Sequence, residues 1–453
     1  MTAPVLSIPS DIQVNSYATN SQGLPSVAAL SDGGWVVTWM SDGQDGSYGV
    51  YAQRYDAAGE AFGSEFRVNG HTAGYQISQS ITALSNGGFV VSWQSDGQDG
   101  GFDVYLQRYD AAGVALGGEV LVNTTTANYQ GRPSIAALSD GGFVVSWEST
   151  GYGADWGNVH LQRYDAGGVA LGDEVQVNAT TAGEQDRPSI AALPDGGYVV
   201  SWVSDGQDGD GRGIYLQRYH VAGVAVGGEV QVNATTAGSQ SLPSVATLSD
   251  GGYVVSWVSD GQDGSDWGVY AQRFDVTGAA IGSEFRVNSH SAGDQSYPSI
   301  TALASGGFVV SWRSDGQDGD GRGIYLQRYD AAGVAVGGEV QVNTYTAGAQ
   351  DRPSIAALLD GGFVVSWQSE GQDGDLFGVF QKVFNADGSE RLFAAEYVEN
   401  APAVAVAPGL VVTDVDSTDL TGATITVTDY VAGEDVLSFI HQGGITGAWD
   451  AAT

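Results

Sequence analysis

The sequence contains no cysteine and a single lysine, Lys382, among its 453 residues. Without cysteine the chain forms no disulfide, so its stability must come from sheet packing or from bound ions. Basic residues are few altogether, because 16 lysines and arginines stand against 53 acids and give a formal net charge of −37. A surface of this charge repels phosphate backbones and anionic lipids. We therefore expect no nucleic-acid partner and no membrane insertion, and cations are the natural small partners.

Long hydrophobic runs are absent as well, since no stretch of 18 apolar residues is present that could cross a membrane as a helix. The first ten residues lack the basic region and the apolar core of a classical signal peptide, so none is expected. The sequence also has no Gly-x-Ser-x-Gly motif, no phosphate-binding loop and no His-Glu-x-x-His motif. Common catalytic motifs are therefore missing.

What the chain does have is a repeat. Asp-Gly-Gly-Phe-Val-Val-Ser-Trp is complete at residues 140–147 and 360–367. Close variants of it end at Trp39, Trp93, Trp202, Trp257 and Trp312. Seven copies at steps of 54 or 55 residues indicate one supersecondary unit that is stacked many times. The glycines suit a tight turn, and the aromatic and β-branched residues after them suit a buried strand.

Each unit contains four short strands, which in the third unit lie at 133–138, 143–147, 160–164 and 174–178. Four-stranded antiparallel sheets repeated around an axis are β-propeller blades, so the sequence predicts an all-β, seven-bladed β-propeller. The fourth strand ends in Val-Asn, but the seventh unit lacks this ending, whereas an extra copy occurs at 14–15. We therefore expect the N-terminal strand to close the last blade and remove an open sheet edge.

The composition divides the chain into three parts. Residues 1–398 form the predicted propeller, and residues 399–408 form a linker rich in proline and alanine. Residues 409–453 carry strand patterns of an Ig-like or cadherin-like β module. This last part is too short for a complete sandwich, which needs about 100 residues, so we expect a partial module.

Propeller topology sorts the loops onto two faces. The turns between the first and second and between the third and fourth strands are short, whereas the loops after the second and fourth strands are longer and more variable. Variable loops on a rigid scaffold are where binding usually resides. We call the face with the longer loops the loop face and the opposite one the turn face.

Acidic residues recur in the loop after each second strand, and calcium prefers such oxygen ligands around a glycine turn. The alternative is that these aspartates only form turns, and this alternative is favoured because glycine and glutamine fill the intermediate positions. The candidate metal ligands are Asp42, Asp45, Asp96, Asp99, Asp205, Asp208, Asp260, Asp263, Asp315, Asp318 and Asp373.

A second candidate set lies nine or ten residues after each core tryptophan. Five aromatic residues and two arginines at such positions could stack on sugar rings or bind acidic glycans, although packing against the neighbouring blade is the favoured alternative. The set comprises Tyr48, Phe102, Trp156, Arg212, Trp267, Arg322 and Phe377.

The repeated unit, with Ser-Asp-Gly-Gln-Asp-Gly and Tyr-Leu-Gln-Arg-Tyr-Asp after the core motif, resembles the tandem repeats of large secreted bacterial proteins of the RTX and adhesin type. Residues 413–417, 423–428 and 433–439 resemble the start of the cadherin-like modules in such proteins. The resemblance implies an extracellular or cell-surface location, type I secretion and calcium. It supplies no catalytic residue.

Because an enzyme normally breaks symmetry at its site and this chain is unusually symmetric, the sequence predicts a non-enzymatic module. Its expected role is extracellular binding, adhesion or spacing in a large bacterial protein, as a monomer that is stabilised by calcium and binds a glycan or matrix polysaccharide. The alternative is a glycan-cleaving enzyme, a hydrolase or lyase, that uses carboxylates of the loop face. Three acids of contrasting environment clustered at one channel mouth would favour the enzyme.

Overall fold

The computed structural model describes residues 5–7, 11–98, 100–126, 128–150, 157–391 and 411–413. Two compact units are present, one of residues 10–394 and one of residues 1–9 with 395–453. In the latter, β1 (Val5–Ser7) pairs antiparallel with β30 (Val411–Thr413). The predicted linker and most of the predicted cadherin-like module lie outside the described residues.

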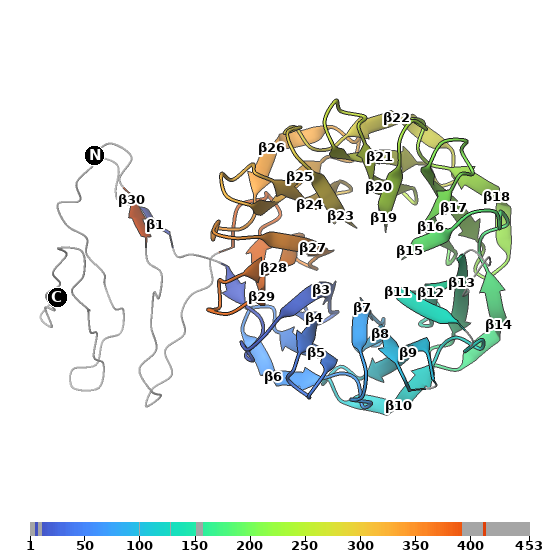
Figure 1. Ribbon diagram of the computed structural model, residues 1–453, viewed down its shortest axis with the longest axis horizontal. Coiled ribbons are helices and arrows are strands. Elements are labelled where there is room, and N and C mark those ends of the chain that lie inside the picture. The colour runs from blue at the N-terminus through green and yellow to red at the C-terminus, as the bar shows by residue number, and fades with distance from the viewer. Residues whose placement is uncertain are drawn as a thin grey trace, which may run out of the picture. The chain divides into compact units, whose positions relative to one another are not determined.

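The larger unit consists of seven four-stranded antiparallel sheets arranged around a centre (Figure 1). The predicted fold class, an all-β seven-bladed propeller, is confirmed. In the described part of the chain there is no helix, and accordingly no helix long and apolar enough to span a membrane.

Each blade contributes its strands in the same order from the centre outward. The innermost strands are β3 (Gln22–Ala29), β7 (Gln76–Ala83), β11 (Tyr129–Ala137), β15 (Gln185–Ala192), β19 (Gln240–Thr247), β23 (Gln295–Ala302) and β27 (Gln350–Ala357). The second strands are β4 (Trp35–Asp42), β8 (Phe89–Asp96), β12 (Phe143–Thr150), β16 (Tyr198–Asp205), β20 (Tyr253–Asp260), β24 (Phe308–Asp315) and β28 (Phe363–Glu370). The third strands are β5 (Tyr48–Tyr55), β9 (Phe102–Tyr109), β13 (Asn158–Tyr164), β17 (Arg212–Tyr219), β21 (Trp267–Phe274), β25 (Arg322–Tyr329) and β29 (Phe377–Phe384). The outer strands are β6 (Ala61–Arg67), β10 (Ala115–Leu121), β14 (Ala170–Gln176), β18 (Ala225–Gln231), β22 (Ala280–Arg286), β26 (Ala335–Gln341) and, in the seventh blade, β2 (Ile12–Gln13).

The second strands are apolar on both faces because each is covered by a neighbouring blade on either side. Their tryptophans, such as Trp147 and Trp367, are fully buried. The core is divided into seven clusters of buried residues, each shared by two adjacent blades. One of them joins Val27 of the first blade to Val364 of the seventh, so the ring is closed by packing as well as by strand pairing.

The predicted closure by the N-terminal strand is confirmed. In β2, Ile12 lies opposite Gln381 and Gln13 lies opposite Phe380 of β29. Asp11 adds an ion pair of 3.3 Å to Lys382, the lysine noted above, and both side chains are almost fully buried. The N-terminus thus supplies a strand edge and a buried charge pair to the last blade.

A repeated acid fastens each blade to the one before it. The carboxylate of Glu229, for example, accepts a hydrogen bond from the backbone N–H of Thr180, and that of Glu339 accepts one from Ser289. In the seventh blade Asp11 takes this role, because its carboxylate accepts hydrogen bonds from the backbone N–H groups of Thr344 and Tyr345. The seventh contact is therefore completed from the opposite end of the sequence.

Candidate active site at the channel mouth

Every innermost strand carries a β-bulge at the same place, and one residue of each bulge has a left-handed backbone. A positive φ in a residue other than glycine costs of order 1 kcal/mol or more, and such strain is concentrated at functional sites. We call these seven residues the mouth ring: Leu24, Ser78, Arg132, Arg187, Leu242, Tyr297 and Arg352, with φ between 46° and 55°.

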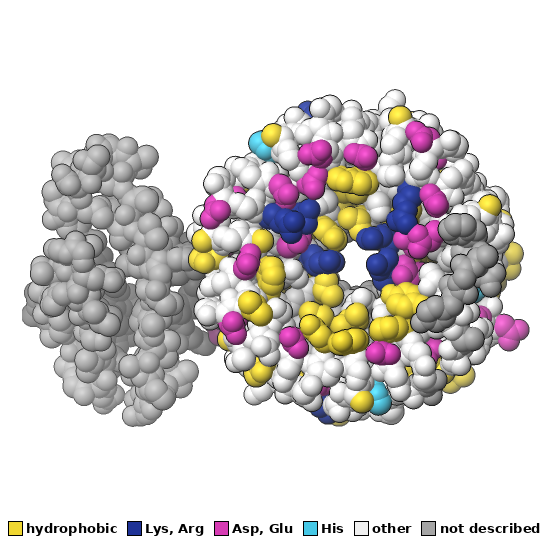
Figure 2. All heavy atoms as spheres, in the orientation of Figure 1, with side chains coloured by type: hydrophobic (Ala, Val, Ile, Leu, Met, Phe, Trp, Pro, Cys, Tyr) yellow, Lys and Arg dark blue, Asp and Glu magenta, His cyan; other side chains and the backbone are white. Residues whose placement is uncertain are grey.

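The backbone of the mouth ring is repeated, but its side chains are not. It contains three arginines, one tyrosine, two leucines and one serine. In Figure 2, basic and acidic side chains gather around the central opening on the side of the third and fourth blades and again on the side of the sixth and seventh. The mouth is therefore the place where this symmetric propeller becomes asymmetric.

On the first side, two carboxylates from adjacent blades share one guanidinium, and we call this group the acid-pair cluster. Arg132 Nη1 lies 3.4 Å from Glu148 Oε2 and 3.9 Å from Asp186 Oδ2. Arg212 Nη1 lies 3.4 Å from the same Asp186 oxygen, and its Nη2 lies 2.5 Å from Glu184 Oε2. The backbone N–H of Arg187 donates to Glu148 Oε2 at 3.1 Å, which joins the two blades at the bulge.

Asp186 has an unusual environment for a carboxylate. Its pKa is raised from 3.8 to about 6, mainly by burial and also by the charge of Glu148, although Arg212 and Arg187 oppose the change. Its Oδ1 atom is buried and accepts no hydrogen bond from the described residues. A carboxyl group that is half-protonated near pH 6 can act as a proton donor in mildly acidic water.

On the second side, two arginines pair with Asp315 and Asp351 and a third lies on a tyrosine ring, and we call this group the arginine cluster. Arg313 and Arg322 each lie within 3.4 Å of Asp351. The guanidinium carbons of Arg313 and Arg352 lie 5.1 Å and 4.7 Å from the ring centre of Tyr297. Tyr297 therefore lies against two guanidinium groups.

In both clusters the most exposed charges are positive. The side chains of Arg132 and Arg322 are 44% and 42% exposed, whereas those of Glu148, Asp186 and Asp351 are 5%, 4% and 10% exposed. Solvent at the mouth thus meets Arg132 and Arg322 above these three buried carboxylates, whereas Glu184 and Asp315 are 36% and 32% exposed beside them. A ligand must pair with or displace these arginines to reach the buried acids.

The predicted loop-face set is split by the structure. Arg212 and Arg322 belong to the acid-pair and arginine clusters, whereas Tyr48 and Phe102 pack on Tyr75 and Tyr129 of the following blade with ring centres 5.2 and 5.4 Å apart. Trp267 is half-buried against the core between the fifth and sixth blades. Phe377 begins β29 opposite Glu370.

In the third blade, the position equivalent to Tyr48 lies one residue later than predicted from the sequence. Its described ladder begins with Asn158 opposite Ser149. The position that matches Tyr48, which lies opposite Asp42 in the first blade, is therefore Gly157. Trp156 lies outside the described residues.

Five of the predicted metal-ligating aspartates have partners in their own loops. The second aspartate of the loop binds its own turn, as in Asp208, whose carboxylate accepts hydrogen bonds from the backbone of Asp210 and from Asn233. Asp263 and Asp318 repeat the backbone bond, as do Asp45 and Asp373. The first aspartates, Asp42, Asp96, Asp205, Asp260 and Asp315, end the second strands, and Asp99 lies outside the described residues. Among the described residues there is no group of three or more acidic or histidine side chains placed to hold a metal ion, so calcium binding stays a prediction from the sequence.

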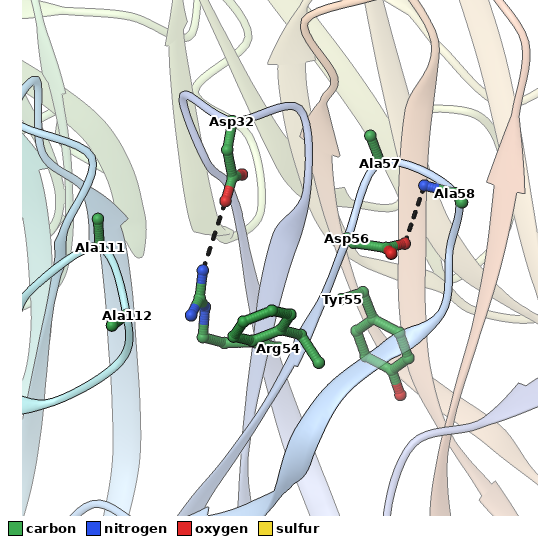
Figure 3. Close-up of a pocket in the computed structure, with 9 residues that line it drawn as sticks. Asp32, Arg54, Tyr55, Asp56, Ala57, Ala58, Ala111 and Ala112 are labelled. Atoms are coloured by element: carbon green, nitrogen blue, oxygen red, sulfur yellow. Dashed lines mark hydrogen bonds and ion pairs between the residues drawn. The ribbon is translucent and has the colours of Figure 1, made fainter.

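A separate hollow lies on the turn face between the first two blades (Figure 3). Its few polar groups are already engaged, because Arg54 pairs with Asp32 at 3.4 Å and the carboxylate of Asp56 accepts the N–H of Ala58. The rest of its wall is made largely of alanines. This hollow offers less chemistry than the channel mouth.

Comparison with known proteins supports the fold and gives no family. No family model and no curated protein matches the chain. A solved protein of unknown function from Dyadobacter fermentans is 12% identical with a TM-score of 0.50, over 83% of this chain and 98% of that one. A polysaccharide lyase, Uly1, is 11% identical with a TM-score of 0.49, over 84% and 98%. An α-L-arabinanase from Penicillium chrysogenum is 14% identical with a TM-score of 0.45, over 86% and 100%. At such identities the likeness shows a shared propeller fold.

The prediction of a non-enzymatic binding, adhesion or spacer module is wrong, and so is the prediction that the protein is not an enzyme. Both were drawn from the symmetry of the repeats, and the mouth does not keep that symmetry. Three acids of contrasting exposure, Glu148, Glu184 and Asp186, gather at one side of it. This clustering meets the condition that the sequence analysis set for the alternative, a glycan-cleaving enzyme.

Proposed function

We propose that the protein is a glycan-cleaving enzyme whose active site is the acid-pair cluster. The observation that carries the proposal is the sharing of Arg132 by Glu148 and Asp186, two carboxylates from adjacent blades. Enzymes that cleave glycosidic bonds by hydrolysis use two carboxyl groups, one protonated and one ionised. Environments that push two carboxyl groups apart in pKa mark such a pair.

Asp186 suits the role of general acid because its pKa is raised to about 6. In its protonated form it would donate a proton to the glycosidic oxygen as the bond to the anomeric carbon breaks. Glu148, held beside Arg132, would take the proton of a water molecule that adds to that carbon. The two steps together consume one water and return both carboxyl groups to their initial state once the proton passes back to Asp186.

Access to this pair depends on the arginines above it. Arg132 and Arg212 have long side chains that are 44% and 31% exposed, so they can move into solvent without disturbing the sheet. Tyr129 lines the same region, and burial together with the charge of Glu148 raises its pKa to about 12. Tyr129 is therefore a neutral hydrogen-bonding group at neutral pH.

The test is cleavage of a panel of neutral and acidic polysaccharides by the full chain. New reducing ends report any cleavage, and ultraviolet absorbance of unsaturated uronate separates a lyase from a hydrolase. We expect Asp186→Asn and Glu148→Gln each to lower the rate by about a hundredfold or more, the range for a lost general acid or base.

Glu148→Gln is compatible with the fold, because glutamine already occupies this position in the second and seventh blades. There Gln94 and Gln368 accept a hydrogen bond from the bulge of the following blade, as Glu148 does. Asp140→Asn on the turn face is the control, because Asp140 is 43% exposed and far along its strand hairpin from the mouth. Absence of cleavage across the panel, or equal loss in all three variants, would refute the proposal.

The finer parts of the sequence interpretation belong to this proposal as well. A secreted or cell-surface location and an origin in a large protein of the RTX type are consistent with the net charge of −37 and the absence of cysteine. A polysaccharide is the partner that the proposed chemistry requires. Fractionation of the native host, followed by immunodetection of the chain, tests the location.

A further inference from the structure

We propose that the channel mouth takes a polysaccharide built from uronic acids, with the sugar carboxylates on Arg187 and Arg352 of the mouth ring. The cleavage of that substrate rests on the proposed function, whereas its binding does not. The inference comes from where the chain places its few cations.

Six of the 16 basic residues lie in the acid-pair and arginine clusters, on a chain whose net charge is −37. They are Arg132, Arg187, Arg212, Arg313, Arg322 and Arg352. Six carboxylates lie among them, namely Glu148, Glu184, Asp186, Asp294, Asp315 and Asp351. The mouth is therefore close to neutral, whereas the rest of the acidic surface would repel a polyanion. The guanidinium fork matches the two oxygens of a carboxylate and binds it in a bidentate manner.

On the acid-pair side, two positive residues lie close together. Arg187 has a pKa that is lowered, first by burial and then by the charge of Arg132. Its Nε–H is buried and donates no hydrogen bond to the described residues, and its nearest acid oxygen is Asp186 Oδ2 at 3.7 Å. A carboxylate between Arg132 and Arg187 would relieve this repulsion. It would also compete with Asp186 and Glu148 for the guanidinium groups and so uncover the proposed catalytic pair.

On the arginine side, Arg352 forms no ion pair within 4 Å with any described carboxylate. Its guanidinium rests instead on the ring of Tyr297. An arginine that is held by an aromatic ring and not by an acid is ready for an external anion. Figure 2 shows the two groups of basic side chains on different sides of the opening, so a chain lying across the mouth would meet both.

Other blades show which substitutions the bulge accepts at the positions of Arg187 and Arg352. The first and fifth blades hold Leu24 and Leu242 at the left-handed position that Arg187 and Arg352 occupy in the fourth and seventh. Arg187→Leu and Arg352→Leu should therefore fold with the same bulge. Arg286→Leu is the control, since it removes an equal charge from a side chain that is 40% exposed on an outer strand.

The experiment measures binding of the full chain to polygalacturonate by affinity electrophoresis, with dextran sulfate and neutral arabinan in parallel gels. We expect retardation by polygalacturonate only, an affinity about tenfold weaker in Arg187→Leu and in Arg352→Leu, and no change in Arg286→Leu. Circular dichroism confirms that each variant is folded.

Five outcomes are informative. No retardation of the wild-type chain by polygalacturonate, or equal weakening in Arg286→Leu, would overturn the inference. Stronger retardation by dextran sulfate would overturn the assignment to carboxylates. Cleavage of neutral arabinan without binding to polygalacturonate would leave the proposed function standing and the inference refuted. Specific binding of polygalacturonate without cleavage of any polysaccharide would support the inference and refute the proposed function.

Discussion

Replacing Asp186 by asparagine should change how the stability of the propeller depends on pH. The carboxyl group is 4% exposed and has a pKa raised from 3.8 to about 6, mainly by burial. Its protonated form is therefore favoured in the folded protein relative to the unfolded chain. Between these two pKa values the folded state binds more protons, so the contribution of Asp186 to stability falls as the pH rises.

The size of this effect follows from the shift. A change of about two pKa units corresponds to about 3 kcal/mol of stability, which is present below about pH 4 and lost above about pH 6. Because a propeller of this size unfolds with a large entropy, 3 kcal/mol changes its melting temperature by about 4 °C. The asparagine in the variant does not titrate, so this pH-dependent part of the stability is absent from it. The substitution also alters the contacts with Arg132 and Arg212, which changes the stability of the variant by an amount that is the same at every pH in this range.

The assay is calorimetric melting of the wild-type chain and of Asp186→Asn at several pH values between about 4 and 8. The wild-type melting temperature minus that of the variant should fall by about 4 °C over this range and level off above about pH 6. Asp186→Ser, which copies Ser241 and Ser296 at the matching positions, should give the same curve. A difference that does not change with pH would show that Asp186 titrates normally and would remove the main support for its role as an acid.

Three further predictions concern activity, ring closure and ions. If Asp186 is the acid, kcat/KM for the cleaved polysaccharide should fall tenfold per pH unit above about pH 6, and a flat profile in that range would contradict the assignment. Asp11→Ala should destabilise the propeller by about 3 kcal/mol because the buried Lys382 loses its nearer carboxylate and keeps only Glu390 at 3.7 Å and the hydroxyl of Thr344, and Asp11→Ala with Lys382→Met should recover most of this in melting experiments. If Lys382→Met does not restore the lost stability, the loss comes from the hydrogen bonds that Thr344 and Tyr345 donate to Asp11, and the explanation by the ion pair is wrong. The sequence predicts calcium in the loops after the second strands, so EDTA should lower the melting temperature of the wild-type chain more than that of Asp208→Asn, and an unchanged wild-type value would rule structural calcium out.

The fold could be predicted from the sequence because its signals are repeated and local. The tryptophan at the end of each second strand, the glycines before it and the Val-Asn ending recur in phase, and the missing seventh ending indicated that residues 11–15 close the ring. The interblade role of Asp11 could not be found in the same way. It replaces a glutamate of the other blades and acts across 333 positions of the chain, which only the closed ring brings together.

The acid-pair cluster could not be predicted from the repeated motifs, because these motifs contain only what the blades share. Asp-Gly-Gln-Asp-Gly is common to most units, and the structure uses its aspartates to hold turns through contacts such as that of Asp263 with the backbone of Ser265. Arg212 and Arg322 are two of the seven members of the predicted loop-face set, and the structure places both at the mouth. Their acidic partners, Asp186 and Asp351, lie 26 and 29 positions away on innermost strands, so no local motif connects them.

The informative signal was variation at positions where the backbone is constant. At the left-handed position of the seven bulges the chain places Leu, Ser, Arg, Arg, Leu, Tyr and Arg on nearly the same φ. At the position after the core tryptophan it places Met, Gln, Glu, Val, Val, Arg and Gln. A residue needed for the bulge would be the same in every blade, so these differences are not required by the fold. Because of these differences, Glu148 and Asp186 of adjacent blades lie around one arginine, and two arginines lie on Tyr297 elsewhere around the ring. A symmetric scaffold can hold an asymmetric site in this way.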